Sequence, residues 1–211
     1  MIYLVIGLAG LYGQTTSNLL WSDDFEDGDA EGWLFYDDAT GPSNWFVDGG
    51  YLNQITNIGE NSLGTHAVAG LASWDNYTLS ANVVSTDDDY LGVIFRYQNA
   101  GNYYRLVVSS QAGRIRLQKR VAGILETMDQ VNMMWPLCTY NISIDVQNDS
   151  ISVYLNNQPY FAVIDTSFAA GRVGFTTINN NGSFFDDIEV YDRLSIQPLD
   201  NSLVINRGPY L

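Results

Sequence analysis

The chain has 211 residues, 46% of them hydrophobic, and a net charge of −15 that comes from 24 acidic and 9 basic residues. A chain this acidic repels phosphate, which argues against nucleic acid or an anionic membrane surface as its main partner. The single cysteine, Cys138, excludes a disulfide bond within the chain.

The first 13 residues, MIYLVIGLAGLYG, form an apolar run that is too short to span a bilayer. Such a run is typical of the apolar region of a signal peptide, although no Lys or Arg precedes it. We therefore expect residues 1–14 to be a partial signal peptide and the protein to be secreted, extracellular or periplasmic. A buried first strand is the alternative. No other segment is apolar for about 18 residues, so we expect no membrane insertion.

Residues 19–33, LLWSDDFEDGDAEGW, predict a strand that runs into an acidic loop. The first and last strands of a sandwich often pair, so this loop is expected to meet the acidic residues near position 187. Calcium takes about six to eight oxygen ligands from flexible loops. We select Glu26, Asp29 and Asp187 as candidate calcium ligands. The alternative is that clustered Asp and Gly residues only form turns.

The next elements are short. The string NWFVDGGYLNQ predicts two strands around the turn Asp48-Gly49-Gly50, because a tight turn with positive φ favours Asp and Gly. Residues 53–69 are interpreted as a loop, which contains His66, the only histidine, without a partner at metal-ligand spacing. Residues 75–84 alternate as a half-buried strand.

A β-hairpin is predicted for residues 87–108, DDDYLGVIFRYQNAGNYYRLVV, and a third strand for GRIRLQKR after it. The period of two places these side chains on the packed face: Leu91, Val93, Phe95, Tyr97, Tyr104, Leu106, Val108, Ile115 and Leu117. The same period places the candidate ligand-binding residues on the opposite face: Arg96, Gln98, Tyr103, Arg105 and Arg116.

Six of the nine basic residues fall in the 25 positions from 96 to 120. Arg96, Arg105 and Arg116 would form a stripe across three strands. Guanidinium groups bind carboxylate or sulfate, and a neighbouring aromatic ring stacks on a sugar face, so the stripe suits an acidic polysaccharide. The alternative is that these arginines pair with acidic neighbours on a solvent-facing sheet.

Strand patterns continue as far as residue 192. The one ambiguous stretch is residues 125–135, LETMDQVNMMW, which could hold one helical turn. About twelve strands without a long helical pattern predict an all-β fold, a two-sheet antiparallel jelly-roll sandwich.

The strings DDFEDGDAEGW, WDNYTLSANV, DDDYLGVIFRYQNAGNYYRL and GRVGFTTINNNGSFFDDIEV, in this order, resemble the concanavalin A-like lectin/glucanase superfamily, in the laminin-G-like modules of secreted bacterial proteins. DDDYLGVIFRYQ is also similar to the C-terminal lectin-like domain of thrombospondins. The resemblance covers residues 19–193 and implies one domain, residues 15–193, a jelly roll of two curved sheets. It also implies a structural calcium and glycan binding or adhesion, with residues 87–89 as a second candidate calcium position.

The tail, residues 194–211, is predicted to be a linker or the start of a truncated domain. Its string SLVINRGPYL resembles the opening of the fibronectin type III-like domain of purple acid phosphatase-like enzymes. That resemblance implies an accessory fragment of a secreted metallophosphoesterase-type enzyme whose catalytic domain lies beyond residue 211. An ordinary C-terminal extension is the alternative.

Catalysis has little support in the sequence. A glucanase of this fold would carry a run of the Glu-x-Asp-x-x-Glu type, because an acid and a nucleophile must flank one bond. The chain has no such run and no Gly-x-Ser-x-Gly motif. We therefore predict no catalytic residues, and a secreted module that binds a glycan or cell-surface ligand and is stabilised by calcium. A structural spacer without a ligand is a further interpretation.

Overall fold

The computed structural model describes residues 18–133 and 136–193. The regular secondary structure within these ranges consists of β-strands. The predicted all-β class is confirmed. No helix in the described ranges has the length and apolarity that crossing a membrane requires. The predicted leader and tail lie outside the described residues. The strands are β1 (Leu19–Asp23), β2 (Leu34–Asp37), β3 (Trp45–Asp48), β4 (Tyr51–Gln54), β5 (Thr65–Ala69), β6 (Tyr77–Ser85), β7 (Tyr90–Asn99), β8 (Asn102–Ser109), β9 (Arg114–Val121), β10 (Ile124–Asn132), β11 (Tyr140–Gln147), β12 (Ser150–Leu155), β13 (Gln158–Ile164), β14 (Arg172–Ile178) and β15 (Ser183–Asp192).

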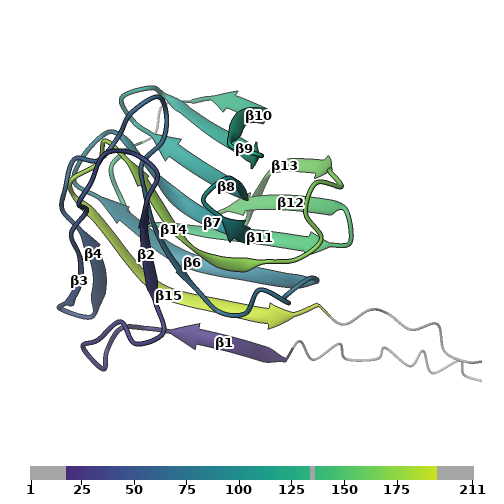
Figure 1. The fold of residues 1–211 in the computed structure, drawn as a ribbon, viewed down its shortest axis with the longest axis horizontal. Helices are drawn as coiled ribbons and strands as arrows, with labels where there is room; N and C mark the ends of the chain where they lie inside the picture. Colours follow the sequence, from purple (N-terminus) through teal and green to yellow (C-terminus); the bar gives the residue numbers. More distant parts are fainter. Residues whose placement is uncertain (1–17, 134–135, 194–211) are drawn as a thin grey trace, which may run out of the picture.

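These strands form two antiparallel sheets that face each other (Figure 1). The eight-stranded sheet has the order β13-β12-β11-β6-β15-β4-β3, with β1 paired to β15. The seven-stranded sheet has the order β10-β9-β8-β7-β14-β5-β2. The last two strands therefore occupy interior positions, one in each sheet. β14 lies between β7 and β5, and β15 lies between β6 and β4. This arrangement confirms the predicted two-sheet jelly-roll sandwich.

The alternation of side chains along each strand builds the core. Burial alternates residue by residue in β6 and β11, where Leu79 and Ile144 point inward and are fully buried. The seven-stranded sheet supplies Val93, Leu106 and Leu117 to the same cluster. Burying one such aliphatic side chain stabilises the fold by about 1.5–3 kcal/mol, so this layer supplies much of the stability.

The first and last strands pair, as the sequence predicts. Leu19 faces Tyr191 and Asp23 faces Ile188, and β1 runs beside β15 in Figure 1. The Asp192 amide also donates to the Asn18 carbonyl at 2.8 Å. The first and last strands are therefore joined to each other by backbone hydrogen bonds.

The segment predicted to hold a helical turn is the edge strand β10 instead. The register between β10 and β9 shifts between Thr127 and Asp129, and the residue added by this bulge breaks the period of two. Leu125, Met128 and Val131 are consequently the half-buried positions. These positions are three residues apart, a spacing that in the sequence is typical of a helix, which is why the sequence predicts a helical turn here.

Residues 53–69 are not one loop. β4 ends at Gln54, and Thr65–Ala69 form β5, which is buried along its whole length between β14 and β2. A strand that is covered on both faces has no alternation, so the period of two carries no signal there. His66 is therefore a buried strand residue.

Candidate functional site

The outward face of the seven-stranded sheet carries arginine, aromatic and amide side chains. Tyr103 and Arg105 extend from β8 on the side opposite the core, and Arg116 and Gln118 do the same on β9. Arg105 pairs with Gln118, and Val107 pairs with Arg116. The predicted placement of these side chains is confirmed. Their role toward a ligand stays a prediction.

Arg96 does not share this face. Its φ is 46°, in the left-handed region, and the register with β8 shifts between Phe95 and Asn99. A bulge of this kind turns the following side chains by one position. The Arg96 amide donates to the Tyr77 hydroxyl at 3.1 Å, and the whole residue is buried. The prediction that Arg96 faces outward is wrong.

The two terminal nitrogens of the Arg96 guanidinium group donate to backbone carbonyl groups, while its Nε is buried without a partner in the described structure. Nη1 donates to the Phe168 carbonyl at 2.9 Å, and Nη2 donates to the carbonyls of Asp75 at 2.9 Å and Asn148 at 2.7 Å. These carbonyls belong to three separate loops at one end of the sandwich. The predicted stripe of three arginines is not formed, and Arg96 holds loops together.

The same bulge moves Tyr97 from its predicted place in the core to the outward face. There Tyr97 packs with Val68, Ile94 and Tyr103 in a small cluster that is separate from the main core. The ring centroids of Tyr97 and Tyr103 lie 6.0 Å apart, and Tyr36 stacks on Tyr97 at 5.7 Å. The aromatic content of this face is therefore higher than the sequence predicts.

Gln98, predicted as a hydrogen-bonding partner for sugar hydroxyl groups, is exposed near the end of β7. Its Nε2 donates to the Ala170 carbonyl at 3.4 Å. Gln98 is absent from the lining of the Arg105 pocket described below. The structure does not bring it together with Arg105 and Arg116.

Asp38 is the centre of a buried polar cluster on the same face. Its Oδ2 accepts hydrogen bonds from His66 Nε2 at 2.9 Å, the Tyr103 hydroxyl at 2.9 Å and Arg120 Nη1 at 2.7 Å. The Asp38 side chain is only 1% exposed. His66 Nδ1 lies 2.9 Å from the Thr176 hydroxyl oxygen. This one carboxylate joins β5, β8 and β9.

The protonation states follow from these contacts. Burial raises the pKa of the Asp38 carboxyl, but the hydrogen bonds and charges of His66, Tyr103 and Arg120 outweigh it and hold that pKa below its usual value. Burial lowers the pKa of His66 more than Asp38 raises it. At neutral pH Asp38 is ionised and His66 is neutral, with Nε2–H donating to Asp38 and Nδ1 accepting from Thr176.

Thr176, His66 and Asp38 line up as a hydroxyl, an imidazole and a carboxylate, like the triad of a hydrolase. Thr176 and His66 are fully buried, however, so a substrate has no access to the hydroxyl oxygen. The cluster is therefore a structural cross-link between strands.

Arg105 lies in a pocket of about 90 Å³ beside this cluster. Its Nε donates to Gln118 Oε1 at 2.9 Å, and Nη2 donates to the Ser62 carbonyl at 2.7 Å. The Arg116 guanidinium carbon lies 5.7 Å from the centre of the Tyr90 ring. We call this hollow the Arg105 pocket; its lining consists of Ser62, Tyr90, Arg105, Val107, Arg116, Gln118, Ile178 and Asn179.

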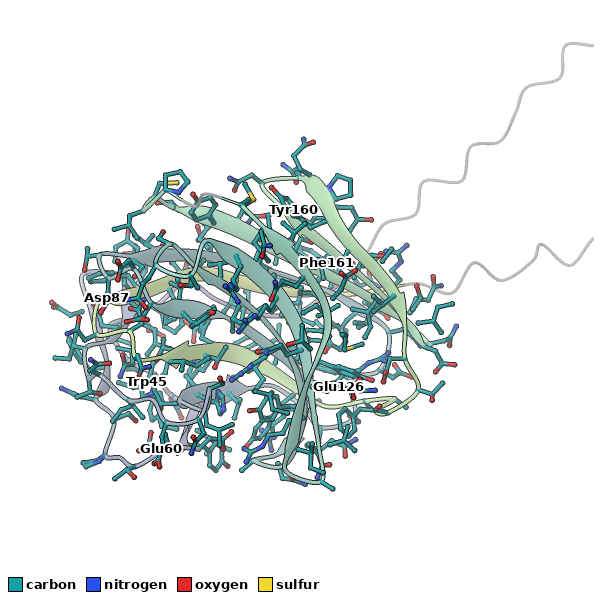
Figure 2. All side chains as sticks on the ribbon, turned by 90° about the horizontal axis from the view of Figure 1, so that it is seen from above. Trp45, Glu60, Asp87, Glu126, Tyr160 and Phe161 are labelled. Atoms are coloured by element: carbon teal, nitrogen blue, oxygen red, sulfur yellow. The ribbon has the colours of Figure 1, made fainter. Side chains whose placement is uncertain are left out.

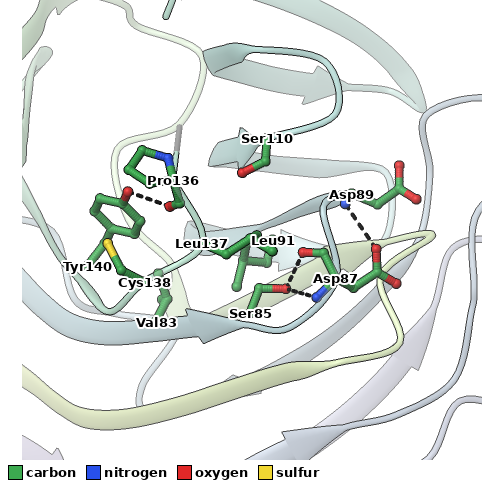
Figure 3. A pocket seen from close by; sticks show the side chains of 10 residues that line it. All are labelled: Val83, Ser85, Asp87, Asp89, Leu91, Ser110, Pro136, Leu137, Cys138 and Tyr140. Carbon is green, nitrogen blue, oxygen red and sulfur yellow. Dashed lines mark hydrogen bonds between the residues drawn. The ribbon is translucent and has the colours of Figure 1, made fainter. Parts of the chain in front are cut away.

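A second hollow, in Figure 3, lies between Asp87 and Tyr140 and has a volume of about 10 Å³. The Ser85 hydroxyl and the Asp87 backbone exchange hydrogen bonds there, and the Asp89 amide donates to Asp87 Oδ1 at 3.1 Å. This volume holds about one water molecule, so the hollow is too small for a sugar.

The candidate calcium ligands do not converge. Asp29 lies on an open acidic hollow with Asp27, where its Oδ1 accepts from the Glu31 amide at 2.8 Å. Asp187 Oδ2 accepts from Asn82 Nδ2 at 2.8 Å. Among the described residues, one group of three acidic side chains has carboxylate oxygens within 4.8 Å of one another. It consists of Asp87, Asp88 and Asp89, and not of the predicted Glu26, Asp29 and Asp187.

The acidic loop after β1 and the acidic residues of β15 do approach each other, as the sequence predicts. Burial raises the pKa of Asp186, and the negative charges of Asp187, Glu26 and Asp24 raise it further. This edge therefore concentrates negative charge without bringing the three predicted oxygen ligands together.

The five central strands of the seven-stranded sheet, β9, β8, β7, β14 and β5, contain no Asp or Glu. Glycosidases need two carboxyl groups that flank the scissile bond, about 5–9 Å apart. On these strands the outward face offers donors and aromatic rings, and the one buried carboxylate beside them, Asp38, is already bound by three donors.

No protein-family model matches the sequence, and no curated protein matches it either. Solved structures match the fold. The carbohydrate-binding module CBM66 from Bacillus subtilis is 14% identical, with a TM-score of 0.66 over 76% of this chain and 96% of that chain. The GH43 protein BlXynB from Bacillus licheniformis is 16% identical, with a TM-score of 0.64 over 82% of this chain and 39% of that chain.

An endo-β-1,3-glucanase from Pyrococcus furiosus is 12% identical, with a TM-score of 0.60 over 85% of this chain and 95% of that chain. The chain has the jelly-roll fold of lectins and glucanases. Identities this low show the fold alone. The more specific resemblances of this jelly roll, to laminin-G-like modules and of the tail to a phosphatase-like enzyme, stay predictions.

Proposed function

We propose that this chain is a non-catalytic carbohydrate-binding module and that its ligand binds at the Arg105 pocket. The observation that carries the proposal is the combination of one aromatic ring, Tyr90, with the guanidinium groups of Arg105 and Arg116 in a hollow on the sheet. A sugar offers an apolar ring face and hydroxyl groups, and it is bound by this combination.

Two further observations support the proposal. The fold is shared with a carbohydrate-binding module, which makes the function plausible as an analogy of fold. The five central strands also lack the acidic residues that a glycosidase would need. We propose that the module acts outside the cytoplasm, on a glycan or cell-surface ligand, in line with the apolar leader.

The Tyr90→Ala variant tests the binding site. We expect it to bind a retained polysaccharide about tenfold or more weakly, because it loses the ring that a sugar would stack against, and tenfold corresponds to about 1.4 kcal/mol. Affinity electrophoresis against a panel of neutral and acidic polysaccharides measures the change. Tyr154→Ala, a half-buried tyrosine of β12 in the other sheet, is the matched control. Equal retention of both variants would place the ligand elsewhere.

A structural calcium ion is a further part of the proposal, held at Asp87–Asp89 rather than at Glu26, Asp29 and Asp187. The support is the convergence of the three carboxylates. Burial raises the pKa of Asp89, and the charges of Asp87 and Asp88 raise it further. A cation there would offset this repulsion. Figure 2 places Asp87 at one end of the molecule, away from Glu126 of β10.

Thermal unfolding with calcium and with a chelator tests the ion. Saturation at about 100 times the dissociation constant stabilises the folded state by about 2.7 kcal/mol, so we expect Tm to rise by several degrees. Asp88→Asn is expected to abolish the rise, and Asp29→Asn to keep it. Curves that overlay with calcium and with chelator would remove calcium from the proposal.

A further inference from the structure

Arg105 is a buried cation without a carboxylate partner. The side chain is fully buried, and its hydrogen bonds go to a neutral amide oxygen of Gln118 and the backbone carbonyl of Ser62. None of the ion pairs within the described residues includes Arg105. A buried charge is costly unless an opposite charge compensates it.

One nitrogen of Arg105 also lacks a hydrogen bond. Nη1 is buried and has no partner in the described structure, although Arg105 lines a pocket. Buried donors are nearly always paired, and one that is not requires an explanation. Asp38 Oδ1 is likewise buried without a partner, but Nη1 and Oδ1 do not bond to each other.

The pocket around Arg105 is positively charged in a chain with a net charge of −15. Its lining contains two arginines, Arg105 and Arg116, and no Asp or Glu. Arg116 Nε donates to the neutral amide oxygen Gln130 Oε1 at 2.8 Å. Arg116, like Arg105, is in none of the ion pairs of the described residues. Within residues 18–133 and 136–193, no Asp or Glu lines the wall of this pocket.

We propose that the Arg105 pocket binds an oxyanion on a sugar, the carboxylate of a uronic acid or the sulfate of a sulfated sugar. This inference rests on the proposed carbohydrate-binding function and names the class of ligand. Arg105 Nη1 and the Arg116 guanidinium group donate to the oxyanion, because planar guanidinium groups match carboxylate and sulfate oxygens. The ring of Tyr90 then lies against the sugar to which the anion is attached.

Arg116 is the part of the wall that moves. It is half-buried and is held by the single hydrogen bond to Gln130 and by the Tyr90 ring. Rotamer changes of interface side chains on binding are common. A rotation of Arg116 opens Nη1 of Arg105 to the ligand, while the buried hydrogen bonds of Nε and Nη2 keep Arg105 in place.

The test uses the chain of 211 residues and matched saccharides. Oligogalacturonate, its methyl ester, a sulfated galactan and a neutral galactan are titrated by isothermal calorimetry into the wild type and into Arg116→Gln. We expect the wild type to bind oligogalacturonate or the sulfated galactan at least about tenfold more tightly than its uncharged counterpart. We expect Arg116→Gln to remove this preference and Arg114→Gln, an arginine of β9 outside the pocket lining, to retain it.

The outcomes separate this inference from the function on which it rests. Preference for the carboxylate identifies a uronic acid, and preference for the sulfate identifies a sulfated sugar; either supports the oxyanion pocket. Equal affinity for charged and uncharged saccharides overturns the oxyanion and leaves the carbohydrate-binding module in place. A charge preference that survives Arg116→Gln places the anion at another surface. Binding of no saccharide overturns both proposals.

Discussion

Arg96→Met is expected to lower the free energy of unfolding by about 3–5 kcal/mol, because it leaves several buried or partly buried carbonyl groups without their donor. The guanidinium group donates to the carbonyls of Phe168, Asp75 and Asn148. Methionine fills part of the volume but leaves three carbonyl groups without donors, and each unsatisfied buried group costs about 1–3 kcal/mol. Urea denaturation followed by circular dichroism measures the loss.

Two further variants define the cause. Arg96→Lys is expected to recover only part of the stability, because one ammonium group does not span carbonyls in three loops as a planar guanidinium group does. Arg114→Met, on β9, is expected to change the free energy of unfolding by about 0.5 kcal/mol or less, as surface substitutions do. A loss below about 1 kcal/mol for Arg96→Met would contradict a role in holding the loops.

Asp38→Asn is the second large effect, with an expected loss of about 3 kcal/mol. The substitution keeps the shape of the side chain but removes the charge that the Arg120 guanidinium group faces at 2.7 Å. It also replaces one carboxylate oxygen with an amide donor next to His66 and Tyr103, which already donate to Asp38. A double-mutant cycle with Arg120→Gln measures the coupling, and strictly additive losses would contradict a shared network.

The same cluster sets a pH dependence. The pKa of His66 is lowered from 6.5 in the folded protein, so the unfolded chain binds a proton first as the pH falls. The pKa of Asp38 is lowered from 3.8, so its contribution is present above that pH and is lost as the pH falls through the folded value. The free energy of unfolding is therefore expected to fall below pH 6.5 and again below pH 3.8. His66→Gln should remove the first fall, and a wild-type profile that is flat from pH 7.5 to 5 would contradict this assignment.

The sequence predicts the sandwich because most strands keep one face inward. The alternation of Leu79 with its neighbours in β6 and of Ile144 in β11 is enough to identify half-buried strands. The pairing of β1 with β15 is also predicted from the sequence, since the first and last strands of a sandwich often pair. Where a bulge interrupts the alternation, as in β7 and β10, the period of two fails.

The site is predicted in part. Arg105 and Arg116 lie within β8 and β9, which pair without a register shift, so the prediction that they face outward is correct. Arg96 lies at a bulge with positive φ, and a non-glycine residue in that conformation leaves no mark in the sequence. Asp38 and His66 lie 28 positions apart, and their contact depends on how β2 and β5 pair, which local patterns do not encode. The one available signal is that a single histidine stands in a short apolar segment, HAVA.

The fastening of β1 to β15 bears on how this sandwich can be rewired. The Asp192 amide bonds to the Asn18 carbonyl at 2.8 Å, at the edge where the described chain enters and leaves the eight-stranded sheet. The Arg105 pocket lies on the other sheet. A short peptide that joins residue 193 to residue 18 would close the chain into a ring, and new ends could be cut at the exposed turn after β12, which Arg96 does not hold. Cargo fused at residue 18 or residue 193 would leave the seven-stranded sheet free, so either position suits immobilisation of the sandwich with the Arg105 pocket facing the solution.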